Sequence, residues 1–158
     1  MKRITFRRWE IAVDREATAR AYERAGREEE ICKCLYCRNY YAAGSGVYPE
    51  EVSEFYKGLG IDIQLPAEVM YSHPVAEHRH VYGGWFHFVG SIASGPDARN
   101  RLAKTVYSID LEPIAYGFSM GFTAQPSLYF RAFFGVPLVQ VEFVTEVDWV
   151  LDDPEPDG

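Results

Sequence analysis

The chain has no run of about 18 apolar residues, so the sequence predicts no membrane-spanning helix. Its N-terminus, MKRITFRRWE, is basic but no apolar segment follows it, so we expect no secretory signal peptide. Cysteine is scarce as well, with three residues among 158. These features predict a cytoplasmic protein that folds without structural disulfides.

Basic residues are outnumbered, with 16 Lys and Arg against 23 Asp and Glu, for a net charge of −7. Four of the acidic residues lie in the last eight positions, so the rest of the chain carries only −3. Such a body matches a phosphate backbone poorly, and the sequence argues against nucleic acid as a partner. The one basic cluster fits the solvent face of an edge strand; it comprises Lys2, Arg3, Arg7 and Arg8.

Familiar catalytic and nucleotide-binding motifs are missing. The Gly83-Gly84 pair does not belong to a G-x-G-x-x-G loop, and the chain has no G-x-S-x-G turn. Paired carboxylates such as Asp110 with Glu112, or Glu142 with Glu146, could do acid–base work. The simpler interpretation is that they form the solvated face of antiparallel strands.

The length and composition are those of one globular domain, because 47% of the residues are hydrophobic and 25% are charged. We predict a single domain over residues 1–150. The last residues, 151–158, contain two prolines and four acids and almost no apolar side chain. We predict that this acidic tail is disordered.

Three helices are predicted in the N-terminal half. Asp14 is a good N-cap for a helix that runs to about Arg27. A second helix begins near Cys34 and ends at Gly44, and a third begins at Pro49 and ends at Gly60. The third helix has an apolar stripe at helical spacing, made by Val52, Phe55, Tyr56 and Leu59.

The remaining segments favour strands. Residues 3–13 alternate, with a change of parity near Arg7 and Arg8 that indicates a bulge or a bend. Further strands are predicted over 67–72, 79–93, 104–111, 115–123 and 138–149. Gly83-Gly84 indicates a bulge or a close approach of another backbone. The order of elements predicts an α+β fold with a mainly antiparallel sheet and about three helices packed on one face.

The cysteines form a C-x-C-x2-C cluster made of Cys32, Cys34 and Cys37. At the start of a helix this spacing lets three thiolates converge on one tetrahedral Zn²⁺, which then needs a fourth ligand from elsewhere. A helix N-terminus would also lower the thiol pKa values. Two other interpretations stay open, namely three inert, partly buried thiols, or a redox or nucleophilic cysteine.

All four histidines lie between residues 73 and 87. His87 is the first candidate for the fourth zinc ligand, because it is a polar ring among aromatic residues. The alternative is a core histidine that is satisfied by a backbone carbonyl. His80 is the second candidate; His78 and His80 share a strand face, and their polar setting also fits a solvated strand end.

Segments spread over almost the whole chain resemble a group of small bacterial proteins with no established activity. They include W-E-I-x-V-D, the cysteine cluster, Y-P-E-E-V, Y-G-G-W-F-H-F-V-G and V-Q-V-E-F-V-T-E-V. The resemblance implies a complete bacterial protein, and it implies no function.

The features together favour a small cytoplasmic binding or interaction protein with a zinc site, whose partner is another protein or a second copy of the chain. The alternative is a small metal- or thiol-dependent enzyme, in which the cysteines act with a histidine or a carboxylate. A third possibility is a ligand-binding sheet lined by aromatic side chains, in which the cysteines have no part.

Overall fold

The computed structural model describes residues 1–156, and it confirms the predicted α+β fold. The helices are α1 (Arg15–Glu28), α2 (Leu35–Ala43) and α3 (Glu50–Leu59), with short 3-10 turns η1 (Gly44–Val47) and η2 (Arg131–Phe133). The strands are β1 (Lys2–Phe6), β2 (Trp9–Val13), β3 (Glu68–Ala76), β4 (Arg79–Ser94), β5 (Arg99–Ala103), β6 (Val106–Ile109), β7 (Glu112–Ala115), β8 (Phe118–Thr123) and β9 (Leu138–Asp148).

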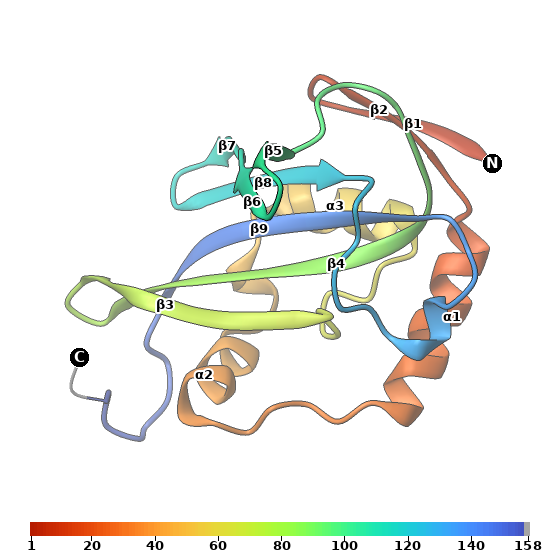
Figure 1. Cartoon of the computed structure of the whole chain (residues 1–158). Helices are drawn as coiled ribbons and strands as arrows, with labels where there is room; N and C mark the ends of the chain where they lie inside the picture. Colours follow the sequence, from red (N-terminus) through yellow and green to blue (C-terminus); the bar gives the residue numbers. More distant parts are fainter. Residues whose placement is uncertain (157–158) are drawn as a thin grey trace.

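Seven strands form one antiparallel sheet in the order β1-β2-β4-β9-β8-β7, with β3 paired to β4. β5 and β6 pair with each other in a separate two-stranded sheet. The long strands β4 and β9 cross the middle of the molecule, α3 lies behind them, and α2 is seen below β3 (Figure 1). None of the helices in residues 1–156 is long and apolar enough to cross a membrane.

The helix ends follow the predicted capping chemistry. The Asp14 carboxylate accepts a hydrogen bond from the Ala17 amide at the start of α1. Pro49 occupies the N-cap position of α3 without a side-chain hydrogen bond, and Gly60 ends the helix with a positive φ of 84°. The side chains of the predicted stripe on α3 are all buried. They pack on an aromatic core that includes Tyr48, Tyr82, Phe86, Phe118 and Phe143.

Helix α1 closes a gap in the edge of the sheet. Along one edge, β4 pairs with β3 through residues 79–85 and with β2 through residues 90–94, so residues 86–89 have a partner strand, β9, only along the other edge. The Tyr22 hydroxyl fills part of this gap, because it donates to the His87 carbonyl and accepts from the His87 amide. Thr18 accepts from the Val89 amide in the same way. The small alanines of α1 allow this close approach.

Two strand predictions were wrong in detail. Residues 3–13 form a hairpin of β1 and β2 rather than one bent strand, because the parity change is a two-residue turn in which Arg7 takes a φ of 52°. The predicted strand 104–111 is shorter in the structure, where only β6 (Val106–Ile109) is a strand. The strands β5 and β7 were not predicted. β5 and β6 are mostly exposed, so they lack the apolar alternation that marks a buried strand.

Gly84 is a point of close approach, as the sequence predicted. A Cβ atom there would meet the Glu68 carbonyl oxygen and lie 2.9 Å from the Phe143 ring. We expect Gly84→Ala to destabilise the protein by about 1–3 kcal/mol, because the strands cannot move apart without losing their hydrogen bonds. Chemical denaturation measures this difference. Gly58→Ala is the control, since its Cβ meets nothing within 4 Å and should stabilise α3 by up to about 1 kcal/mol. A Gly84→Ala protein as stable as the wild type would contradict the packing.

The last described residues return to the body of the protein. Arg38 pairs with Asp153, and the Trp149 indole donates to the Asp153 carbonyl. Glu155 lies between His78 and His80, with its two oxygens each 2.7 Å from a ring nitrogen. Asp157 and Gly158 lie outside the described residues. The domain boundary at 150 and the disorder of the tail stay predictions.

Candidate metal centre

The structure brings the three predicted cysteines together. Their sulfur atoms all lie within 4.8 Å of one another, and they are the one such group of potential ligands among residues 1–156. Three sulfurs bound to one tetrahedral zinc ion at 2.3 Å would be about 3.8 Å apart. The cluster therefore needs to contract by about 1 Å at most to fit this ion.

The start of α2 produces this arrangement. Cys34 is the N-cap of the helix, and its Sγ accepts a hydrogen bond from the Cys37 amide at 3.4 Å. Cys37 lies in the first turn and is buried, while Cys32 and Cys34 are exposed. The capping position thus orients the Cys34 thiol over the helix N-terminus, and Cys32 lies in the segment that precedes the helix.

The pKa values of Cys34 and Cys37 are shifted in opposite directions. The hydrogen bond from the Cys37 amide lowers the pKa of the Cys34 thiol, since it stabilises the thiolate. Burial, together with the neighbouring Cys34 and Cys32, raises the pKa of Cys37. A divalent cation would remove this conflict, because it stabilises all three thiolates at once.

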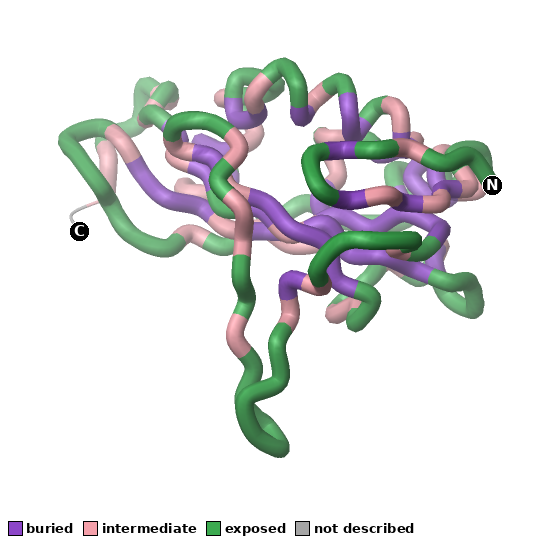
Figure 2. Tube along the Cα trace, turned by 90° about the horizontal axis from the view of Figure 1, so that it is seen from above, coloured by how far each residue is buried: buried purple, intermediate pink, exposed green. Residues whose placement is uncertain are grey.

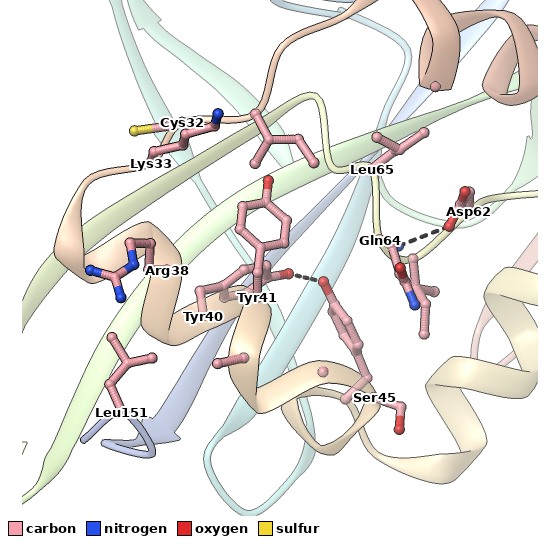
Figure 3. A pocket seen from close by; sticks show the side chains of 16 residues that line it. Cys32, Lys33, Arg38, Tyr40, Tyr41, Ser45, Asp62, Gln64, Leu65 and Leu151 are labelled. Atoms are coloured by element: carbon pink, nitrogen blue, oxygen red, sulfur yellow. Dashed lines mark hydrogen bonds between the residues drawn. The ribbon is translucent and has the colours of Figure 1, made fainter. Parts of the chain in front are cut away.

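A cleft of about 870 Å³ adjoins the cluster, and Cys32 is part of its wall. Figure 3 shows Cys32, Lys33 and Arg38 at one end of the cleft and Asp62 with Gln64 at the other. The Tyr41 ring stands between these ends. The volume lies in the range of small-molecule sites, which are apolar with a few polar groups at their ends.

A smaller cavity of about 180 Å³ shares Cys32, Tyr41 and Leu65 with the cleft. Cys32 and Cys37 line it together with three carboxylic acids, Glu29, Glu30 and Glu68. The sequence analysis named none of these glutamates: Glu29 and Glu30 are neighbours of Cys32 in the chain, whereas Glu68 is far from the cluster and only the fold brings it there. Thiolates beside carboxylates concentrate negative charge, which is the environment that attracts a cation.

His87, the first predicted fourth ligand, is not part of the cluster. Its ring is fully buried next to Tyr129 and Phe133, and its Nε2 lies 3.0 Å from the Gln140 side-chain oxygen. His87 and Gln140 are opposite each other on β4 and β9. Burial lowers the pKa of His87 to about 4, so the ring is neutral. The Gln140 side-chain amide pairs with Nε2, in place of the backbone carbonyl of the alternative interpretation, and Nδ1 is buried without a hydrogen-bond partner.

His80, the second predicted ligand, also has other partners. Its Nδ1 lies 3.2 Å from the Tyr71 hydroxyl, and its Nε2 contacts Glu155. The exposed His78 contacts the same carboxylate, and the pKa of His78 is raised by that hydrogen bond. His73 is exposed and bonds to Ser72. The structure thus groups the cysteines with one another and none of the histidines with them.

Glu112, Glu142 and Glu146 lie on strands, whereas Asp110 lies between β6 and β7 and accepts a hydrogen bond from Asn100. Glu142 accepts a hydrogen bond from Gln140, and burial raises the pKa of Glu142. Glu146 pairs with Arg79, and Glu112 pairs with Arg8. None of them lines the cleft or the small cavity beside the cysteines.

Comparisons of the chain with protein-family models, with curated proteins and with solved structures find no match. The function is therefore argued from the site alone.

Proposed function

We propose that this protein is a small binding protein in which Cys32, Cys34 and Cys37 hold a zinc ion beside a ligand cleft. One observation carries the proposal: three sulfur atoms lie within 4.8 Å of one another, and the cysteine that bears one of them, Cys32, is part of the wall of an 870 Å³ cleft. Neither feature alone would suffice, because buried thiols and surface clefts are both common.

The donor set favours zinc over harder cations. Thiolates are soft ligands that bind Zn²⁺ or Cu⁺ in preference to Mg²⁺ or Ca²⁺. Because the thiols must stay reduced to bind the metal, the proposal places the protein in a reducing compartment, the cytoplasm. The fourth ligand is then a water molecule, a carboxylate from the small cavity, or a donor atom of a molecule in the cleft.

Elemental analysis of untagged protein purified without chelator tests the proposal. We expect about one zinc per chain, and thiols that react with a thiol reagent only after a chelator is added. Cys34→Ser should lose the zinc. His73→Ala is the control for adventitious binding, since His73 is exposed and contacts Ser72. Metal-free protein whose thiols are indifferent to chelator would remove the proposal.

The fourth ligand can be found by substitution. If a carboxylate of the small cavity completes the site, Glu68→Gln or Glu30→Gln should weaken zinc affinity at least about tenfold, as expected for loss of a direct ligand. If both variants bind zinc as the wild type does, the fourth position belongs to water or to a bound molecule. Competition with a chromophoric zinc chelator measures these affinities.

A second candidate function, thiol-dependent chemistry, is favoured by the exposure of Cys34 at the N-terminus of α2. In metal-free protein at pH 7.5, we expect iodoacetamide to modify Cys34 first and the buried Cys37 last. Peptide mapping over time measures the order. Equal rates at all three cysteines would contradict the helix-terminus effect and count against this candidate.

A further inference from the structure

Residues 99–109 form a hairpin, called the arm below, that projects from the body of the protein. Its strands β5 and β6 pair with each other alone among the described strands. Figure 2 shows the arm as a long, mostly exposed loop that extends from the side of the sheet opposite α3.

The base of the arm is fixed. The Ala98 amide donates to the Phe122 carbonyl, and the Asp110 amide donates to the Ala98 carbonyl, both at 2.7 Å. The Arg99 guanidinium donates to the Gln125 carbonyl. Gly121 makes room for this junction, since a Cβ there would lie 2.8 Å from the Ala98 methyl group. The arm therefore leaves the body in a defined direction.

The arm exposes several large apolar side chains, which is unusual for a hairpin that is surrounded only by water. Leu102 is 67% exposed and Val106 is 50% exposed, and Tyr107 and Ile109 are also exposed. An isolated two-stranded hairpin is marginally stable in water, and three or more strands or a packed face are needed to hold it. We conclude that another surface covers the arm.

The face of the sheet from which the arm projects is also partly apolar and open. Met70, Gly83, Val144 and Ser119 are opposite one another across β3, β4, β9 and β8. They point away from the helices, because Thr145 next to Val144 bonds to the Val47 carbonyl on the helix side. Met70 is 50% exposed and Val144 is 40% exposed. Between them lies Gly83, which has no side chain.

The arm and the rest of the chain carry net charges of opposite sign. Residues 99–109 carry three positive charges, on Arg99, Arg101 and Lys104, and no negative charge. Since the whole chain carries −7, the remaining residues carry −10. A basic, apolar arm is complementary to the acidic body of a second copy of this chain, and like charges disfavour pairing of two arms.

We propose that two copies of the chain form a reciprocal dimer in which the arm of each lies across the open sheet face of the other. The contact places Leu102 and Val106 of one copy against Met70 and Val144 of its partner. It is isologous, as a two-fold axis requires, because each copy offers one arm and one face. The cysteine cluster has no part in it, so the dimer and the metal site can be tested separately.

Sedimentation equilibrium of the full chain at several concentrations tests the dimer. We expect a concentration-dependent dimer whose dissociation constant rises at least about thirtyfold in Leu102→Ser/Val106→Ser, as for loss of two central apolar contacts. Val144→Arg on the face should have a similar effect. Tyr116→Ser is the matched control, because Tyr116 is 93% exposed but lies outside the arm and the face. Circular dichroism confirms that each variant is folded.

A mixture of the arm variant and the face variant tests the reciprocal contact most directly. Neither variant alone has both an intact arm and an intact face, so each should be monomeric. A mixture of the Leu102→Ser/Val106→Ser and Val144→Arg proteins restores one of the two contacts, and a heterodimer should form. A wild-type chain that is monomeric at all concentrations, a dimer unaffected by the arm variant, or a mixture without heterodimer would each overturn the proposal. Binding of a DNA duplex by the arm in place of dimerisation would also overturn it.

Discussion

Zinc should raise the melting temperature of the metal-free protein by roughly 8–16 °C. A ligand that binds the folded state alone stabilises it by about 4 kcal/mol at a thousand times its dissociation constant. For a chain of this size each kcal/mol corresponds to roughly 2–4 °C. The physical origin of the effect is that the three sulfurs converge in the folded state and are scattered in the unfolded chain. Differential scanning calorimetry with buffered free zinc measures the shift.

Cys34→Ser provides the matched control for the zinc effect. The hydroxyl can still cap α2, because serine is a preferred N-cap residue, so the metal-free stability should change little. The shift caused by zinc should be lost or greatly reduced. An equal shift in the wild type and in Cys34→Ser would show that zinc binds elsewhere, and no shift in either would contradict the metal site.

Acid should destabilise the protein through His87. In the unfolded chain histidine titrates near its ordinary pKa of about 6.5, whereas burial holds the pKa of His87 in the folded protein at about 4. As the pH falls through 6.5, the unfolded state takes up a proton that the folded state does not. The free energy of unfolding should therefore fall by about 1.4 kcal/mol per pH unit, and by about 3 kcal/mol in total at pH 4.

The His87 contribution can be separated from other titrating groups by comparing variants. His87→Gln removes the titrating ring, so the slope of unfolding free energy between pH 6 and pH 4.5 should decrease by nearly one proton. His73→Gln is the control, because His73 is exposed. Urea denaturation at several pH values measures the slopes. If His87→Gln keeps the wild-type slope, the buried histidine is not held neutral as described.

Local signals in the sequence predicted the helices and the longest strands well. Asp14, Pro49 and Gly60 mark helix ends by their own side-chain or backbone chemistry, and the alternation in β9 follows from its one buried face. The change of parity near Arg7 and Arg8 predicted a bulge or a bend, and the turn between β1 and β2 carries no glycine that would have marked it. β5 was missed, and the predicted strand 104–111 is longer than β6, because neither face of these two strands is packed on the core.

The site was predictable where its residues are neighbours in the chain. The spacing of Cys32, Cys34 and Cys37 indicated convergence, and the helix start realises it. The histidine candidates depended on long-range placement, which the sequence does not give. His87 and His80 lie seven positions apart on β4, so their side chains point to opposite faces of the sheet. The glutamates of the small cavity come together from two distant segments.

The central claim is that the three cysteines bind one metal ion, and zinc X-ray absorption spectroscopy tests it most directly. The account predicts about three sulfur neighbours at roughly 2.3 Å and one nitrogen or oxygen neighbour near 2.0–2.2 Å. A zinc ion surrounded by nitrogen and oxygen atoms alone, or protein that does not retain zinc through gel filtration, would contradict the account.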